Sequence, residues 1–342
     1  MSLLIIVTVV AVGLAAIALF GGLLTIVGHA VRLRVEHRRN QLFESLVRRI
    51  LENLEKPDWD RDLVEVIRRN PALGAELFSE ISELVRGESG ERVLNLCRRA
   101  GIDRWLLRRA RSWRTERRRV AVDTLRLFPG EETVAALQRA LADPSNEVRL
   151  TAALSLAELG AIPPVSTVVQ MVLGNTSEQS LLLNRLFDRL AALRPAEVLD
   201  VAKGPVSKAF LRPIAIRALG EAGRLELKDA IAGLIEDPEP EVRAAALDAA
   251  GDFGDFDAKE HVRRALKDPV QFVRIRAINA ARRLDLRELA PEIAALLADA
   301  NWWVRFRAGE ALAAFGVPVP EPERKVIDLV QAGNAARARG AA

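Results

Sequence analysis

Hydrophobic residues follow two patterns along the chain, an uninterrupted run at the start and a helical spacing after it. Residues 3–28 contain no charged side chain. As a helix they would measure about 39 Å at 1.5 Å per residue, which exceeds the roughly 30 Å of hydrocarbon in a bilayer. We therefore predict a transmembrane anchor over residues 1–28. A cleaved signal peptide is the competing interpretation, but it would need positive charge before a shorter apolar run.

Positive charge follows the apolar run and indicates its orientation. Glu36 is the one acid in a basic stretch that contains Arg32, Arg34, Arg38 and Arg39. Because basic residues favour the cytoplasmic side, we expect a single-pass protein of the inner membrane, with its N-terminus outside and its C-terminal domain in the cytoplasm. The single cysteine, Cys97, is consistent with a cytoplasmic domain because it cannot form an internal disulfide bond.

The two segments that follow the anchor are predicted to be helical. Residues 29–56 carry apolar side chains at three- and four-residue spacing, which predicts an amphipathic juxtamembrane helix that packs onto the neighbouring domain. Residues 57–112 are interrupted by proline and glycine, and they are expected to form short helices that cap the domain behind them. At the other end of the chain, residues 336–342 are expected to be a disordered tail.

A recurring string predicts that residues 113–335 form an array of repeats. The string Asp-Pro-x-x-x-Val-Arg, with close variants, stands at residues 143–149, 237–243, 268–274 and 299–305, and its last three copies are 31 residues apart. Projecting this period backwards gives about seven units. In each unit, aspartate and proline start a helix, apolar residues follow at helical spacing, and glycine stands near the helix end. Such helix pairs bury their apolar faces by stacking on their neighbours.

The string resembles the HEAT repeat, in the short form that is also seen in phycobilisome-lyase-like proteins, over residues 113–335. The resemblance implies an all-α fold, in which a HEAT-type α-solenoid follows the transmembrane helix and works mainly as a binding surface. It also implies a structural ladder in which recurrent arginines pair with aspartates of the Asp-Pro turns. The ladder residues are Asp143, Arg149, Asp237, Arg243, Asp268, Arg274, Asp299 and Arg305.

Composition agrees with an all-helical protein and adds one basic region. Tyrosine is absent and aromatic residues make up only 5% of the chain. The net charge of +4 is modest, and no nucleic-acid partner is expected from it. Residues 98–119, however, contain many arginines interleaved with tryptophans. The candidates there for contact with an anionic surface are Arg104, Trp105, Arg108, Arg109, Arg111, Trp113 and Arg114.

The 98–119 cluster has three interpretations. Its arginines can pair with acids of neighbouring helices, such as Glu76, Glu80, Glu83 and Glu88. They can instead contact anionic lipid headgroups, since helical arginine with tryptophan suits a membrane interface. The third interpretation is RNA binding, which a domain tethered to a membrane makes less favourable than lipid binding.

Catalytic chemistry has little support in the sequence. There is no Walker loop, no Rossmann fingerprint and no Cys-x-x-Cys motif, and the three histidines are too scattered for a metal site or a catalytic triad. Cys97 lies in an apolar helical stretch and is interpreted as a small buried hydrophobe. We therefore expect no catalytic residue, metal, cofactor or small-molecule substrate, and no enzyme. Chromophore attachment, as in lyase-type HEAT proteins, is the distant alternative.

The favoured function is that of a membrane-anchored scaffold or adaptor, which presents the HEAT array to another, membrane-bound protein at the cytoplasmic face. A general likeness to anchored bacterial HEAT proteins points to an accessory role beside a membrane enzyme complex, such as an envelope glycosyltransferase system. Binding of anionic lipid or another polyanion through the 98–119 cluster is the alternative. Two regions are candidates for partner contact. They are the pair Trp302 and Trp303, one of which is expected to cap the array against residues 326–330, and the second-helix residues Lys228, Lys259, Arg263 and Lys267.

Overall fold

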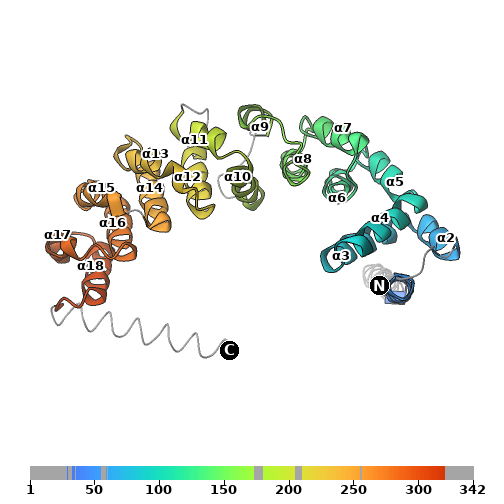
Figure 1. Ribbon diagram of the computed structural model, residues 1–342, viewed down its shortest axis with the longest axis horizontal. Coiled ribbons are helices and arrows are strands. Elements are labelled where there is room, and N and C mark those ends of the chain that lie inside the picture. Colours follow the sequence, from blue (N-terminus) through green and yellow to red (C-terminus); the bar gives the residue numbers. More distant parts are fainter. Residues whose placement is uncertain are drawn as a thin grey trace, which may run out of the picture. The chain divides into compact units, whose positions relative to one another are not determined.

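The computed structural model describes residues 29, 33–34, 36–54, 59, 61–172, 180–204, 210–254 and 256–319, and every regular element in these ranges is helical. The prediction of an all-α fold is confirmed for this part of the chain. The chain divides into two compact units between Arg111 and Ser112. Figure 1 labels the helices of both units.

Unit 1 is a set of helices packed around an apolar core. Residues 36–53 are helical, and this helix buries Leu46 and Ile50. Proline starts the second of the helices that follow, and a left-handed glycine, Gly101, ends the third. These helices are α2 (Arg61–Arg69), α3 (Pro71–Leu84), α4 (Glu88–Ala100) and α5 (Ile102–Arg109).

Unit 2 is a stack of helix pairs that form two layers. Figure 1 shows the successive pairs packed next to one another along the unit. The first helix of each pair contacts the first helix of the next pair, and the second helices cover the other side. The first-helix layer consists of α6 (Thr115–Leu125), α8 (Asn146–Glu158), α10 (Leu181–Leu193), α12 (Leu211–Glu221), α14 (Pro240–Phe253), α16 (Gln271–Arg283) and α18 (Trp302–Ala314). The second-helix layer consists of α7 (Glu131–Ala140), α9 (Val165–Val172), α11 (Pro195–Lys203), α13 (Lys228–Ala232), α15 (Lys259–Ala265) and α17 (Ala290–Ala295).

Tight 3₁₀ turns shorten the second helices near the end of the array. The α-helical parts of α13, α15 and α17 are only 5, 7 and 6 residues long. Because 3₁₀ bonds satisfy backbone groups that a short helix leaves unpaired, such turns stabilise the ends of these helices. The turns are η1 (Leu225–Leu227), η2 (Gly233–Glu236), η3 (Phe256–Ala258), η4 (Arg287–Leu289) and η5 (Leu296–Ala298).

The valine of the repeat string fixes the register of the first helices. Val242, Val273 and Val304 are between 0% and 1% exposed, so each lies in the core between the layers. At the other end of the helix the chain turns through a left-handed residue, which is Gly254 in one repeat. In the next repeat Asp285 takes this position with φ 50°, since aspartate enters the left-handed region more readily than most residues.

The expected transmembrane anchor, residues 1–28, lies outside the described residues. Among the helices that are described, none has the length and apolar character needed to cross a membrane. The longest of them, over residues 36–53, carries charged side chains along its whole length, and α3 and α14, with 14 residues each, span about 21 Å, short of a bilayer core. This finding corrects the prediction of a single-pass inner-membrane protein with its C-terminal domain in the cytoplasm. The expected cap over residues 326–330 and tail over 336–342 also lie outside the described part.

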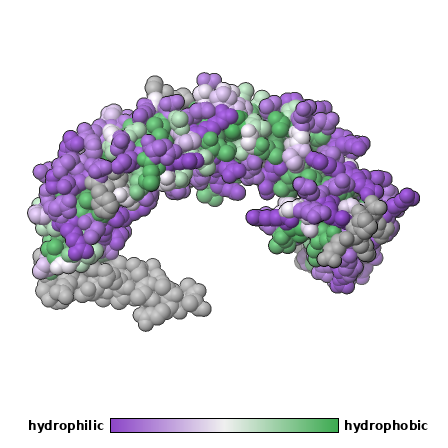
Figure 2. All heavy atoms as spheres, viewed as in Figure 1, coloured by the Kyte–Doolittle hydropathy of each residue, from purple (hydrophilic) through white to green (hydrophobic). Residues whose placement is uncertain are grey.

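Most of the surface of unit 2 is hydrophilic, with hydrophobic residues in patches. Figure 2 shows these patches between charged and polar side chains on the face turned toward the viewer. Isolated hydrophobic residues are normal on a protein surface, whereas contiguous exposed ones mark places where a partner can bind. The last repeats expose three aromatic side chains of this kind, namely Phe272, Trp302 and Trp303.

Candidate functional site

An arginine–aspartate ladder connects successive repeats of unit 2. In each rung an arginine pairs with the aspartate that opens the next repeat, 25 residues further along the chain. Arg243, for example, donates from Nε to Oδ2 of Asp268 at 2.7 Å and from Nη1 to the carbonyl oxygen of Asp237 at 3.0 Å. Each rung therefore joins two turns. The rungs are Arg118–Asp143, Arg212–Asp237, Arg243–Asp268 and Arg274–Asp299.

Two rungs use arginines that the sequence interpretation left out. Arg118 and Arg212 lie in less regular repeats, and the signal that would have identified them is the 25-residue spacing to an Asp-Pro turn. Arg149 and Arg305 were expected in the ladder, but the positions 25 residues beyond them lie outside the described residues. Both donate to carbonyl oxygens of their own turns.

The rungs keep their aspartates in the charged form. Burial alone would raise the pKa of Asp143, Asp237 and Asp299, but hydrogen bonds from an arginine and from a backbone N–H lower each pKa below its ordinary value. The opposite charges of the ladder compensate each other inside the array. The ladder therefore has a structural role and offers little charge to a partner.

In unit 1 the 98–119 cluster lies on and just after α5. The guanidinium of Arg109 packs over the ring of Trp105, 4.7 Å from the ring centroid. Glu76, one of the acids expected to neutralise the cluster, pairs with Arg39 instead. The remaining candidates of this unit are exposed, namely Arg104, Arg108 and Arg111.

In unit 2 the same cluster is partly paired. Arg118 is a ladder residue, and Arg119 pairs with Glu116 of its own helix at 2.7 Å. Trp113 is 81% exposed, and the guanidinium of Arg114 lies 4.7 Å from the centroid of its ring. Structural pairing therefore accounts for part of the charge, and the expected contact with an anionic surface stays a prediction for the exposed part.

The second-helix candidates are mostly paired between repeats. Lys267 is exposed. The other three each reach an acid 29 residues further along: Lys228 with Asp257 at 2.8 Å, Lys259 with Glu288 at 3.4 Å, and Arg263 with Glu292 at 3.0 Å. These pairs hold three of the four basic residues between successive repeats, and the expected contact with a partner stays a prediction.

Trp302 and Trp303 form an aromatic cluster with Phe306 at the start of α18. Trp302 stacks on Phe306 with ring centroids 5.3 Å apart, and Trp303 meets both rings edge-on. Trp302 is 43% exposed and Trp303 56%, whereas Phe306 is buried. Trp302 thus shields Phe306, while the ring of Trp303 is more open to solvent. The expected contact of either tryptophan with residues 326–330 lies outside the described part.

Burial makes Cys97 a poor nucleophile. Its side chain lies in the core of unit 1, and burial, together with the charge of Asp103, raises the pKa of the thiol to about 12. Because the thiolate is the reactive form, we predict that Ellman's reagent does not label the folded protein at neutral pH, and that denaturant restores full labelling. Rapid labelling of the native protein, measured by absorbance, would contradict this account.

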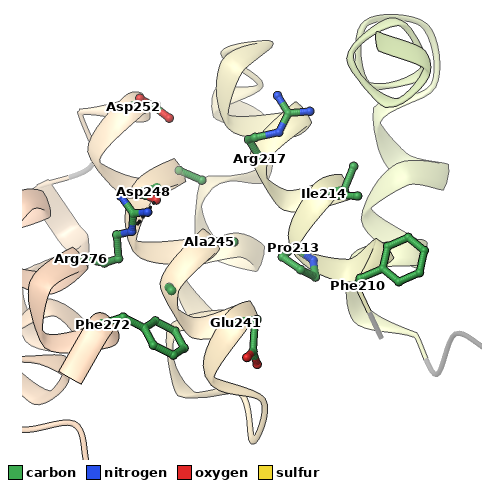
Figure 3. Close-up of a pocket in the computed structure, with 12 residues that line it drawn as sticks. Phe210, Pro213, Ile214, Arg217, Glu241, Ala245, Asp248, Asp252, Phe272 and Arg276 are labelled. Carbon is green, nitrogen blue, oxygen red and sulfur yellow. Dashed lines mark ion pairs between the residues drawn. The ribbon is translucent and has the colours of Figure 1, made fainter. Parts of the chain in front are cut away.

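A hollow opens in the first-helix layer over α14, between α12 and α16, and Figure 3 shows its lining. Its volume is about 400 Å³, within the range of binding pockets. The floor is one face of α14, which presents Ala244, Ala245 and Ala249. The walls are formed by larger side chains of α12 and α16. The sequence interpretation did not identify this site.

Small residues on α14 create the hollow. At the 31-residue period of the array, the position of Ala245 is taken by Ile214 on α12, Arg276 on α16 and Arg307 on α18. The position of Ala244 is likewise taken by larger residues in the repeats on either side. Larger side chains therefore rise on both sides of a repeat that has only methyl groups at these two positions.

Close packing holds the α12 wall against the floor. Gly220 of α12 lies so near α14 that a Cβ added to it would be 2.9 Å from the Cβ of Ala249. Real Cβ atoms do not approach this closely, so a glycine is required where the two helices touch. The close contact thus fixes the distance between α12 and α14, the wall and the floor of the hollow.

The charged groups that line the hollow are paired at one end and unpaired at the other. Arg276 places Nε 3.3 Å from Oδ2 of Asp248. Arg217 pairs with acids of α10 and of its own helix, and Asp252 pairs with an arginine of α16. Glu241, at the other end, is exposed and forms no ion pair among the described residues, although its charge acts on Arg243 two residues further on. The hollow therefore presents one carboxylate that is not held in an ion pair.

The carboxyl at the paired end of the hollow is partly buried. Burial raises the pKa of Asp248 above its ordinary value, and the charges of Arg276 and Arg283 oppose this rise only in part. The side chain of Asp248 is still 37% exposed, so a bound molecule can reach this ion pair from the hollow.

Two phenylalanines flank the unpaired carboxylate. Phe210 lies at the start of α12 and Phe272 in the first turn of α16, and Figure 3 shows Glu241 between them. Phe272 is 37% exposed. Glu241 itself stands in the first turn of α14, where its charge also interacts favourably with the helix dipole. This end of the hollow therefore combines exposed aromatic surface with negative charge.

A family model described as HEAT repeats matches two stretches of the chain, residues 103–181 and 211–282, the first of which starts before the array boundary expected at residue 113. The match agrees with the two-layered stack of helix pairs in these stretches and supports the α-solenoid that the repeat string predicted. A comparison with curated proteins finds no match.

Solved helical structures are similar to the chain at low identity. The karyopherin Kap121p bound to the extreme C-terminus of the protein phosphatase Cdc14p is 12% identical, with 80% of this chain and 35% of that chain covered and a TM-score of 0.45. The CpcE–CpcF complex of phycocyanin lyase from Nostoc is 18% identical, with 67% and 94% covered and a TM-score of 0.31. Human deoxyhypusine hydroxylase is 15% identical, with 73% and 97% covered and a TM-score of 0.32. This chain spans about a third of the length of the karyopherin chain.

Proposed function

We propose that this protein is a scaffold that binds a segment of another protein in the hollow over α14. HEAT repeats support a protein-binding role, since stacked helix pairs expose extended surfaces suited to such contacts. The observation that carries the proposal is the hollow itself. It places an alanine floor beside the exposed ring of Phe272 and an unpaired carboxylate, in an array whose ladder charges are compensated internally.

Binding without catalysis is part of this proposal. The lining of the hollow consists of alanine, other apolar side chains and charged groups that mostly pair with one another, and this composition suits recognition better than reaction. Within the described ranges, no group of three or more histidine, cysteine or acidic residues is placed to hold a metal ion. Cys97, the single thiol, is buried in the other unit.

The partner is proposed here only as a protein. The expected accessory role beside a membrane enzyme complex depended on the membrane anchor, and it is not retained after the correction of the localisation. The hollow lies in unit 2, whose repeats define it without reference to the rest of the chain.

Filling the hollow should abolish partner binding without unfolding the array. We predict that Ala245→Trp removes a specific set of proteins from those captured by the full-length chain in a lysate of its source cells, as measured by quantitative mass spectrometry. The array should tolerate this change because the equivalent positions already hold Ile214 and Arg276. Ala294→Trp, at an exposed alanine of the other layer, is the matched control.

The comparison between these two variants decides the outcome. Proteins that are lost with Ala245→Trp but retained with Ala294→Trp bind through the hollow. If both variants melt at the wild-type temperature and capture the same proteins as the wild type, the hollow is not the binding site and the proposal is wrong.

A further inference from the structure

A stripe of side chains continues from the hollow across the first-helix layer. Phe210, Glu241, Phe272 and Trp303 follow one another at intervals of 31 residues, so they occupy the same position in successive repeats. Glu241, Phe272 and Trp303 lie in the first turns of α14, α16 and α18 and are exposed. Phe210, half-buried at the start of α12, lines the hollow together with Glu241 and Phe272.

The spacing of the stripe matches a polypeptide in the polyproline II conformation. Packed helices lie about 10 Å apart, so neighbouring members of the stripe are separated by about one helix spacing. A polyproline II helix advances about 3.1 Å per residue and has three residues per turn, so every third side chain lies on the same face. A peptide that crosses the first helices near their N-termini would therefore meet a new member of the stripe about every third residue.

We propose that the occupant of the hollow is a segment of another protein in the polyproline II conformation, which carries a lysine or arginine with apolar side chains three residues to either side. The basic side chain binds Glu241, and the two apolar side chains pack on Phe210 and Phe272. This inference rests on the proposed function and adds the chemistry of the partner to it. A further apolar residue, three positions beyond, extends the contact to Trp303.

Charge complementarity is the reason why the central residue of the bound segment is expected to be basic. Glu241 is the carboxylate of the hollow that lacks an ion-pair partner among the described residues, whereas Asp248 already faces Arg276. An acidic residue at this point would instead be repelled by Glu241. The aromatic–acid–aromatic order is symmetric, so the same pattern fits a peptide in either chain direction.

The test measures binding of synthetic peptides to the full-length chain by fluorescence polarisation. The probe, called the lysine probe, has the sequence Leu-Ser-Ser-Lys-Ser-Ser-Leu. Two comparison peptides, the norleucine probe and the glutamate probe, carry norleucine or glutamate in place of the lysine. A spacing control moves both leucines one residue closer to the lysine. We expect the lysine probe to bind at least about tenfold more tightly than the glutamate probe, as loss of a charge-assisted contact implies.

Variants of Glu241 make the assignment specific. Glu241→Gln should weaken binding of the lysine probe by about tenfold and leave the affinity for the norleucine probe unchanged. Glu241→Lys should reverse the preference, so that the glutamate probe binds more tightly than the lysine probe. Glu239→Gln, at an exposed acid two residues earlier, is the control and should change neither probe. Equal affinities for lysine, norleucine and glutamate, or no loss with the altered leucine spacing, would overturn the proposal.

A crosslinking measurement distinguishes this inference from the proposed function. A photoreactive amino acid at position 245 of the full-length chain should join to the lysine probe. If it joins instead to residues 320–342 of the same chain, the chain's own C-terminal segment is the occupant and a separate partner is excluded. If Ala245→Trp still removes captured proteins while the charge of the probe has no effect, the hollow binds proteins but the basic-residue assignment fails.

Discussion

Replacing Val273 with aspartate should unfold the array at temperatures at which the wild-type protein is intact. Val273 is 0% exposed in the core between the two layers. A carboxylate at this position would lose its water without gaining a partner, and such a change costs about 4 kcal/mol of unfolding free energy. The melting temperature, followed by circular dichroism, measures the effect. Val242→Asp, at the equivalent position of the preceding repeat, should act in the same way.

An exposed charge change in the same string provides the control. Glu239→Lys reverses a charge in the turn before α14, where the side chain is exposed, and it should alter stability by no more than about 0.5 kcal/mol. The contrast follows from the register of the repeat, which points valine inward and this glutamate outward. Equally mild effects of Val273→Asp and Glu239→Lys would show that the register is wrong.

The fold was predictable where the sequence repeats a local rule. Proline, the buried valine and the glycine near the helix end each report on their own repeat, so their spacing is sufficient to predict paired helices. The spacing placed a helix even in a unit that lacks the Asp-Pro turn, where α10 runs over Leu181–Leu193. The shape of the second helices was less predictable, since the 3₁₀ turns around α13 and α17 depend on how short helices end against their neighbours.

The candidate site was less predictable because it depends on what a repeat lacks. Ala245 draws no attention in an alanine-rich helix, and it becomes part of a hollow only when Ile214 and Arg276 stand on either side of it. A comparison of equivalent positions at the 31-residue period would have exposed this difference. The second-helix candidates show a related limit of the sequence, since basic residues that look unpaired in it, such as Lys228, pair with acids of the next repeat.

The ladder should make the array sensitive to the loss of a single arginine. Arg212 and Asp237 are 13% and 9% exposed, with Nη1 and Oδ1 3.0 Å apart. We predict that Arg212→Met lowers the unfolding free energy at neutral pH by about 3 kcal/mol, because it leaves a buried carboxylate without its partner. Adding Asp237→Asn should recover part of the loss, since the uncompensated charge is then gone. Arg287→Gln, which breaks the exposed pair with Asp285, is the control and should have little effect.

The pH dependence of the same variant tests the cause of its instability. Because the pKa of Asp237 is lower in the folded state than in the unfolded chain, its stabilisation is present above the unfolded pKa of about 4 and is lost as the pH falls through the folded pKa. Arg212→Met has lost the hydrogen bond and the charge that lower this pKa, so the wild type and the variant should converge in stability below about pH 4. Denaturant unfolding from pH 7 to pH 3 measures the difference. A gap that stayed constant over this range would mean that Arg212 stabilises the array through its packing and its bond to the Ala202 carbonyl, and not through the charge of Asp237.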